Sequence, residues 1–135
     1  MKATTVLTVG CFDMLHEGHA HLFRECGKRG AVVAAAHSDK AIWHLKGRFP
    51  VQTLSQRIRN VLDTGLVEKC YEIEGTDPSE WVRWIVSVRK DCIFMRGNDM
   101  PVFPGLKTVE ELGIPIVLIE RVGNFSSTNR RNECA

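Results

Sequence analysis

Two histidines three residues apart, His16 and His19, lie in the segment that runs from Gly10 to His19. If a helix begins here, this spacing places both imidazoles on one face of it. A helix N-terminus presents backbone N–H groups and the positive end of the helix dipole, which together favour an anion. Gly10 lets the backbone approach a ligand closely, and Gly18 leaves room between the imidazoles. The segment therefore predicts a polyphosphate site that stabilises charge as it develops.

The same histidines could instead be surface residues or metal ligands. A zincin motif places its two histidines four residues apart, with a glutamate at a set position between them, whereas His16 and His19 are one position closer. No third ligand is evident near them. The five cysteines are widely spaced and form no C-x-x-C pair, so a zinc site is not expected. We therefore expect no metal held by the protein itself.

A second segment, Lys46-Gly47-Arg48, lies in a stretch from 38 to 52 that we expect to be a loop. A basic residue on a mobile loop can close over a triphosphate and add positive charge only when substrate is bound. Asp39 lies near the start of the stretch and could orient it. Without the other motifs, a solvated loop would explain these residues equally well.

A third segment begins at Arg121, whose guanidinium could neutralise phosphate oxygens. The residues after it could cap a helix and offer hydroxyl and N–H groups to an anion: Ser126, Ser127 and Thr128. As an isolated cluster they would be a plain helix cap.

Apolar runs and helix-like segments alternate along the chain and must position these residues. The pattern predicts strands at 5–9, 31–37, 69–73, 92–95 and 115–119, and helices near 18–28, 53–65, 77–88 and 106–112, with a possible last helix from 126. Trp81, Trp84, Ile85 and Val88 recur at helical spacing, which favours a core stripe over a surface that stacks on a cofactor. We expect an α/β fold: one domain over 1–135 with a Rossmann-like, doubly wound, parallel five-stranded sheet. Ligands of such folds bind at the carboxyl ends of the strands, where all three segments fall.

The composition excludes several classes of protein. The 135 residues carry a net charge of +2, with 44% hydrophobic and 25% charged residues, which is typical of a globular domain. This charge is too small to indicate nucleic-acid binding. There is no apolar run of about eighteen residues, so we expect no membrane span. The first residues lack a basic region followed by an apolar core, so we expect no secretory signal and a cytoplasmic protein.

The pattern Gly10-x-Phe12-Asp13-x-x-His16-x-Gly18-His19 resembles the signature of the cytidylyltransferase-like nucleotidyltransferases. The resemblance covers nearly the whole chain, and Lys46 and the stretch from Arg121 to Thr128 fall in register with it. It implies that the catalytic residues are His16, His19, Lys46 and Arg121. It implies that the nucleotide is bound by Gly10, Cys11, Phe12, Asp13, Gly18, Arg96, Asn98, Asp99, Ser126, Ser127 and Thr128. It also implies Mg²⁺ carried on the nucleoside triphosphate and a homodimer, with neither nucleic acid nor membrane as partner.

The resemblance points to two sets of substrates. Arg121, Ser126 and Thr128 match the last motif of the cytidylyltransferases, so our main prediction is CMP transfer from CTP to a small phosphorylated alcohol such as glycerol 3-phosphate. The runs Leu45-Lys46-Gly47, Pro50-Val51 and Gln56-Arg57 look more like the heptose adenylyltransferases, and the alternative is therefore ATP with a sugar phosphate. The run from Gly65 to Glu68 also departs from the glycerol-3-phosphate enzymes. A nucleotide-binding module without catalysis is the alternative of another class.

Overall fold

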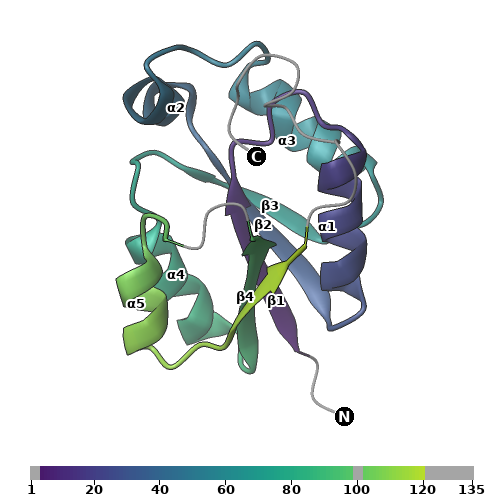
Figure 1. Cartoon of the computed structure of the whole chain (residues 1–135), viewed down its shortest axis with the longest axis vertical. Coiled ribbons are helices and arrows are strands. Elements are labelled where there is room, and N and C mark those ends of the chain that lie inside the picture. The colour runs from purple at the N-terminus through teal and green to yellow at the C-terminus, as the bar shows by residue number, and fades with distance from the viewer. Residues whose placement is uncertain (1–3, 99–101, 121–135) are drawn as a thin grey trace.

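In a computed structural model, residues 4–98 and 102–120 of the chain are described. Five strands form one sheet: β1 (Thr5–Gly10), β2 (Ala31–His37), β3 (Lys69–Ile73), β4 (Cys92–Gly97) and β5 (Ile116–Ile119). All neighbours pair in parallel, in the order β3-β2-β1-β4-β5 (Figure 1). The chain builds outward from β1 to β3 on one side and then from β4 to β5 on the other. This doubly wound, Rossmann-like sheet confirms the predicted fold class.

The helices cover both faces of the sheet. Helices α1 (Glu17–Gly27) and α3 (Leu54–Asp63) pack on one face, and α4 (Ser79–Val88) and α5 (Leu106–Glu111) pack on the other (Figure 1). The remaining helix, α2 (Asp39–Lys46), lies beyond the carboxyl end of β2, at the top of the view. Among the described residues, no helix is long and apolar enough to cross a bilayer.

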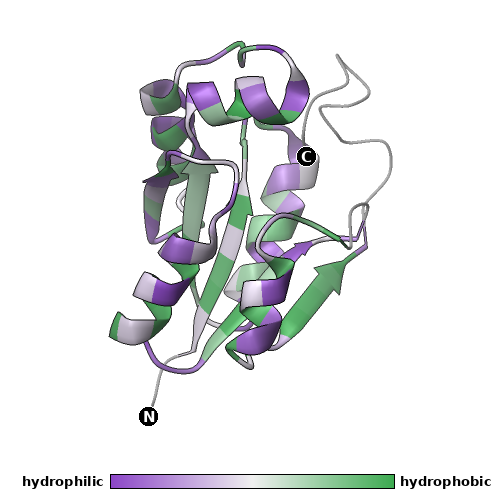
Figure 2. Cartoon of the chain, turned by 90° about the vertical axis from the view of Figure 1, so that its left-hand side faces the viewer, coloured by the Kyte–Doolittle hydropathy of each residue, from purple (hydrophilic) through white to green (hydrophobic). Residues whose placement is uncertain are grey.

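Two cores, one on each face of the sheet, hold these layers together. Successive side chains of β1 point to opposite faces, so Val6 belongs to the core under α1 and α3, and Leu7 to the core under α4 and α5. Phe23 of α1 and Ile85 of α4 are the matching buried side chains. Each such burial stabilises the fold by about 1.5–3 kcal/mol. In Figure 2 most strands are coloured hydrophobic or intermediate, whereas the helices alternate between hydrophilic and hydrophobic residues.

The stretch predicted to be a loop from 38 to 52 contains α2, so that prediction is wrong. Ser38 caps the helix, because its Oγ accepts the N–H of Ala41 at 3.1 Å. Gly47 ends it in the left-handed conformation, at φ 77°, which glycine adopts without strain. Only Ala41 and Ile42 are buried, so the helix has too little apolar pattern to be detected. Lys46 is therefore the last residue of a helix.

The predicted core stripe of α4 is also partly wrong. Val82 and Ile85 are buried, whereas Trp84 is 47% and Val88 58% exposed. The reason lies in the sheet order: β3 is an edge strand, and the sheet does not continue beyond it to cover that side of α4. Trp84 packs there against the ring edge of Tyr71 in β3, with the ring centroids 5.3 Å apart.

Candidate functional site

The site lies where the order of strands reverses. In doubly wound sheets, ligands bind outside the carboxyl ends of the strands at this point. Here the reversal falls between β1 and β4, which are neighbours in the sheet. Strand β1 ends at Gly10 and leads into α1, while β4 ends at Gly97 and is followed by Asn98. The fold thus brings the segment from Gly10 to His19 and the predicted site residues that follow β4 to the same edge of the sheet.

His16 and His19 form a reciprocal cap at the N-terminus of α1. The Nδ1 atom of His16 accepts the N–H of Gly18 at 3.0 Å, and Nδ1 of His19 accepts the N–H of His16 at 3.2 Å. The pattern is a capping box, which is usually built from Ser or Thr and Glu or Gln. The ring centroids are 4.1 Å apart. The predicted placement of both imidazoles at one helix start is therefore what the structure shows.

This cap fixes which nitrogen of each ring carries the proton. Backbone N–H groups can only donate, so Nδ1 of His16 and Nδ1 of His19 must each be unprotonated. In a neutral imidazole the proton then lies on Nε2, which becomes a hydrogen-bond donor. Two such donors, beside the positive end of the α1 dipole, form a group suited to an anion with several oxygens.

Phe12 and Cys11 are placed beneath this group. Phe12 is 1% exposed, and its ring lies 6.0 Å from that of His19 in an edge-to-face arrangement and 5.5 Å from that of Phe23. Cys11 is also buried. The structure therefore gives Phe12 a supporting place in the core, where it holds the ring of His19 from below.

Asp13 is fully buried and binds the segment that precedes α3. One carboxylate oxygen accepts the N–H of Val51 at 2.8 Å, and the other accepts the N–H of Gln52 at 3.0 Å. The N–H of Met14 is donated to Oε1 of Gln52 at 3.0 Å. Phe12 and Met14 have φ of 55° and 57°, a conformation that costs about 1–3 kcal/mol for each such residue. The contacts of Asp13 help to offset that strain, so Asp13 is a positioning residue for the loop.

Replacing Asp13 with asparagine is expected to loosen this loop. The amide keeps one acceptor oxygen and places an NH₂ group against a backbone N–H that needs an acceptor. Leaving a buried donor unsatisfied costs about 1–3 kcal/mol, so the free energy of unfolding in urea should fall by that amount. Glu17→Gln is the control, because it breaks an exposed ion pair to Arg24 and should cost less than about 1 kcal/mol. Equal effects of the two variants would contradict the role given to Asp13.

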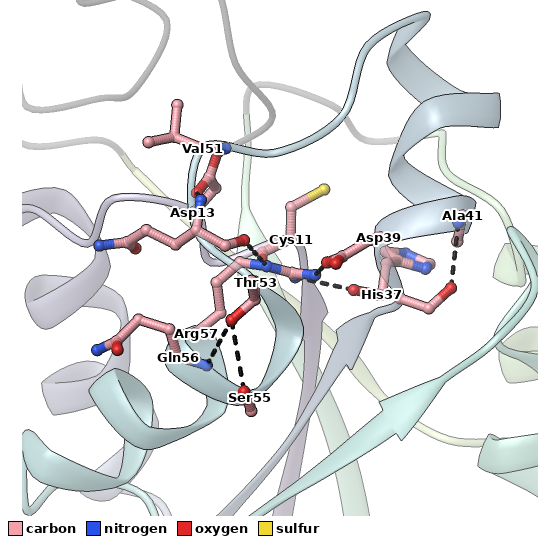
Figure 3. A network of polar contacts seen from close by, with 12 residues as sticks. Cys11, Asp13, His37, Asp39, Ala41, Val51, Thr53, Ser55, Gln56 and Arg57 are labelled. Carbon is pink, nitrogen blue, oxygen red and sulfur yellow. Dashed lines mark hydrogen bonds and ion pairs between the residues drawn. The ribbon is translucent and has the colours of Figure 1, made fainter.

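A buried arginine, Arg57 in α3, joins four elements at the carboxyl edge of the sheet (Figure 3). Its Nη1 donates to the carbonyl of Cys11 at 2.7 Å and to that of His37 at 2.8 Å. Its Nε donates to the carbonyl of Gln52 at 3.0 Å, and its Nη2 pairs with Asp39 at 2.6 Å. These contacts fix the ends of β1 and β2, the turn into α3 and the start of α2.

The role of Arg57 was missed in the sequence. Residues 54, 58 and 61 form the apolar stripe of α3, and position 57 falls within it. A charged residue in such a stripe is the signal that could have revealed a buried contact. Through its pair with Asp39, Arg57 also positions α2, whose last residue is the exposed Lys46. Asp39 therefore orients this segment, as its place after β2 indicated.

At the end of β4, an aromatic stack holds Arg96. Its guanidinium lies 4.4 Å from the ring centroid of Phe103, a cation–π contact. Phe103 in turn stacks on Phe94, with centroids 5.2 Å and planes 4° apart. Asn98 donates its N–H to the carbonyl of Ile119 at 3.0 Å, and its side chain is exposed. Both residues therefore lie at the carboxyl edge, and their contacts with the nucleotide stay predictions.

Positive charge gathers around His37 at the end of β2. Burial lowers the pKa of this histidine below its ordinary value. Its Nδ1–H donates to the carbonyl of Gly75 at 3.3 Å, which opposes that fall, while the charges of Arg57 and Arg96 lower the pKa further. The ring is thus neutral at neutral pH, and Arg57 and Arg96 are the described cations whose charge acts on it.

Several predicted site residues lie outside the described part of the chain: Asp99, Arg121, Ser126, Ser127 and Thr128. Their roles, and the helix expected from 126, stay predictions. Within residues 4–98 and 102–120, no three histidine, cysteine, aspartate or glutamate side chains are grouped so that they could hold a metal ion.

Comparison with known proteins adds a family and several relatives. The family described as cytidylyltransferase-like matches residues 7–133. The bifunctional protein HldE of Desulfatibacillum aliphaticivorans is 34% identical over 126 residues, which are 91% of this chain and 25% of that protein. The bifunctional protein HldE of Proteus mirabilis (strain HI4320) is 32% identical over 127 residues, which are 92% and 26% of the two. The chain spans about a quarter of the length of these relatives.

Solved structures share the fold. A lipopolysaccharide core biosynthesis protein from Thermoplasma volcanium GSS1 superposes with a TM-score of 0.67 at 21% identity, over 89% of this chain and 97% of that one. A putative nicotinate-nucleotide adenylyltransferase from Vibrio parahaemolyticus superposes with a TM-score of 0.60 at 14% identity, over 97% and 85%. At these identities the likeness concerns the fold alone.

Proposed function

The chain belongs to the cytidylyltransferase-like family, and on that basis we propose that it transfers a nucleotidyl group from a nucleoside triphosphate to a phosphorylated acceptor and releases pyrophosphate. The observation that carries the proposal is the reciprocal cap of His16 and His19. It combines two imidazole donors with a helix N-terminus at the point where the sheet order reverses. Hydrogen-bond donors and a helix N-terminus are the groups that bind and stabilise the negative charge of a polyphosphate.

In the proposed reaction, a phosphate oxygen of the acceptor attacks the α-phosphorus in line, and pyrophosphate leaves. The attacking oxygen is already anionic, so neither a general base nor a covalent intermediate on the protein is required. Catalysis then consists of positioning and of charge stabilisation. We assign the Nε2–H groups of His16 and His19 to oxygens of the triphosphate that gain charge in the transition state.

Other residues complete the proposed site. Lys46 and Arg121 would neutralise charge on the α- and β-phosphates, and the three hydroxyl residues from Ser126 to Thr128 would hold phosphate. The base and ribose contacts are assigned to Arg96, Asn98 and Asp99. Mg²⁺ would be bound by β- and γ-phosphate oxygens. The contacts of Asp13 fit a metal that is bound by the nucleotide rather than by the protein. Both oxygens of this buried carboxylate already accept backbone N–H groups. By the same resemblance we propose a homodimer.

For the substrates, we favour ATP and a sugar phosphate of the heptose-phosphate kind. The HldE relatives support this alternative better than the main prediction from the sequence, CTP with glycerol 3-phosphate. The runs at 45–47, 50–51 and 56–57, which resemble those of the heptose adenylyltransferases, support the same alternative. CTP is kept as the second candidate because Arg121, Ser126 and Thr128 match the last motif of the cytidylyltransferases.

A pyrophosphate-release panel tests the proposal, with ATP and CTP each offered against sugar phosphates and glycerol 3-phosphate. We expect release with ATP and a sugar phosphate. We also expect ATP to raise the melting temperature, because a ligand at a hundred times its Kd stabilises the folded state by about 2.7 kcal/mol. Release with CTP alone would favour the second candidate. Binding of ATP with no release from any pair would indicate a nucleotide-binding module without catalysis.

A further inference from the structure

A hollow of about 470 Å³ lies between α3 and the β1–α1 loop, the loop that leads into the histidine cap. One side is apolar and is formed by Met14 and Leu15, the two residues directly before His16. The other side is polar and comes from α3 and its flanking turns: Gln52, Asn60, Asp63 and Thr64. Its size falls within the range of about 300–1,000 Å³ that is usual for small-molecule sites.

The polar wall of this hollow is held in place by a chain of amides. Oε1 of Gln52 accepts the N–H of Met14 at 3.0 Å and Nδ2 of Asn60 at 3.3 Å. Oδ1 of Asn60 accepts Nε2 of Gln56 at 2.9 Å. Because the oxygen of Gln52 is taken by these two donors, its NH₂ group is the part that can donate to a ligand. A bound molecule would therefore meet a preorganised donor rather than a mobile side chain.

The charge of the wall selects the kind of ligand. Asp63 is the one acidic side chain among the described lining residues, and it forms no ion pair with any of the residues that the structure describes. A carboxylate repels a phosphate, but it accepts hydrogen bonds from hydroxyl groups strongly. Among the described residues, the lining contains no lysine or arginine to offset that repulsion. A carboxylate, an amide donor and an apolar side together suit an uncharged molecule with many hydroxyl groups.

We propose that this hollow binds the hydroxyl-rich, uncharged part of the acceptor, while the acceptor's phosphate lies at the histidine cap. The inference rests on the proposed function, which places the reacting phosphate beside His16. Leu15 lines the hollow and directly precedes His16 in the chain, so the hollow and the phosphate site are next to each other along the β1–α1 loop. A three-carbon triol would leave most of the hollow unfilled, so a sugar is the class of acceptor that the site fits.

The first test is kinetic and uses Asp63→Asn. Asp63 is exposed, so the variant should fold. Loss of a hydrogen bond to a charged group corresponds to a rise of about 10-fold or more in the KM of the sugar phosphate. The KM of the nucleotide and kcat should stay near the wild-type values. Glu111→Gln, an exposed carboxylate on α5, is the matched control and should change none of the three. An unchanged acceptor KM in Asp63→Asn would overturn the proposal.

The second test measures binding and needs no turnover. In nitrogen-15 NMR spectra, the side-chain amides of Gln52 and Asn60 report on the hollow, and the backbone amide of Gly18 reports on the cap. D-mannose, glycerol and inorganic phosphate serve as probes. We expect D-mannose to shift the two side-chain amides more than glycerol does, and phosphate to shift Gly18.

Phosphate shifting the side-chain amides, or D-mannose leaving them unchanged at millimolar concentration, would overturn the site. So would a dependence of these two signals on protein concentration without sugar, since a second copy of the chain would then cover the hollow. If D-mannose binds as expected but no pair of substrates releases pyrophosphate, the proposed function fails while the sugar site stands. If pyrophosphate is released but the acceptor KM is unchanged in Asp63→Asn, the sugar site fails while the proposed function stands.

Discussion

Replacement of His16 with alanine is expected to lower kcat by about 100-fold or more, the scale of losing one donor to the transition state. The variant loses the Nε2–H group assigned to the triphosphate. It also loses the Nδ1 acceptor for the N–H of Gly18. Loss of an N-terminal cap should lower the free energy of unfolding by about 0.5–2 kcal/mol. Pyrophosphate release at saturating substrate gives kcat, and urea denaturation gives the stability.

His16→Asn separates these two losses. Asparagine is a good N-terminal cap, but it has no donor where Nε2 of the imidazole lies. We expect wild-type stability in this variant and a kcat as low as in His16→Ala. His21→Ala, at a half-exposed position of the same helix, is the control and should keep full activity. If asparagine restored kcat along with stability, His16 would be a helix cap and no more.

Replacement of Arg57 with alanine is expected to produce the largest loss of stability, about 3–5 kcal/mol, because each backbone carbonyl left without a donor costs about 1–3 kcal/mol. Three backbone carbonyls would lose their donor, and Asp39 would lose its partner. Because Asp39 anchors the start of α2, the KM of the nucleotide should rise in any variant that still folds. Urea denaturation and pyrophosphate release measure the two effects.

Arg57→Ala could fail to fold, so a milder variant and a control variant accompany it. Arg57→Lys keeps the charge but not the planar fork of donors, so one ammonium cannot serve four separated acceptors. We expect a smaller loss of stability than with alanine and a raised KM for the nucleotide. Arg59→Ala removes an exposed arginine from the same helix and should cost less than about 0.5 kcal/mol. Similar stability of the 57 and 59 variants would show that the buried contacts of Arg57 contribute little.

The sheet could be predicted because its strands are short apolar runs between helix signals. Strand β2 is apolar on both faces from Ala31 to Ala36, which is the mark of a buried parallel strand. Helix α2 was missed because two buried residues in eight produce little periodicity. In α4, the spacing of Trp81 and Trp84 indicated a buried face, but both pack against Tyr71 at the edge of the sheet. The order of the strands decides which of them forms the edge, and the spacing of apolar residues in the sequence does not reveal that order.

In the candidate site too, local features could be predicted from the sequence and long-range contacts could not. The spacing of His16 and His19 was enough to place both rings at the start of one helix, because that geometry is local. The contacts of Arg57 reach residues 46, 20 and 18 positions away in the chain, so only the folded sheet brings them together. The nucleotide contact predicted for Asp13 stays a prediction, and the contacts of its oxygens with backbone N–H groups 38 and 39 positions away appear only in the folded chain. The family predicted from the motif is confirmed by the match over residues 7–133.

The reciprocal cap of the two histidines also limits what this scaffold can evolve to do. Each Nδ1 is committed to a backbone N–H, so His16 and His19 can give a hydrogen bond but cannot take a proton without opening the first turn of α1. A neutral alcohol attacking phosphorus needs such a proton acceptor, and an ionised oxygen does not. New acceptors should therefore be recruited among molecules that arrive already charged, and acquiring an alcohol substrate would require a base from another part of the chain.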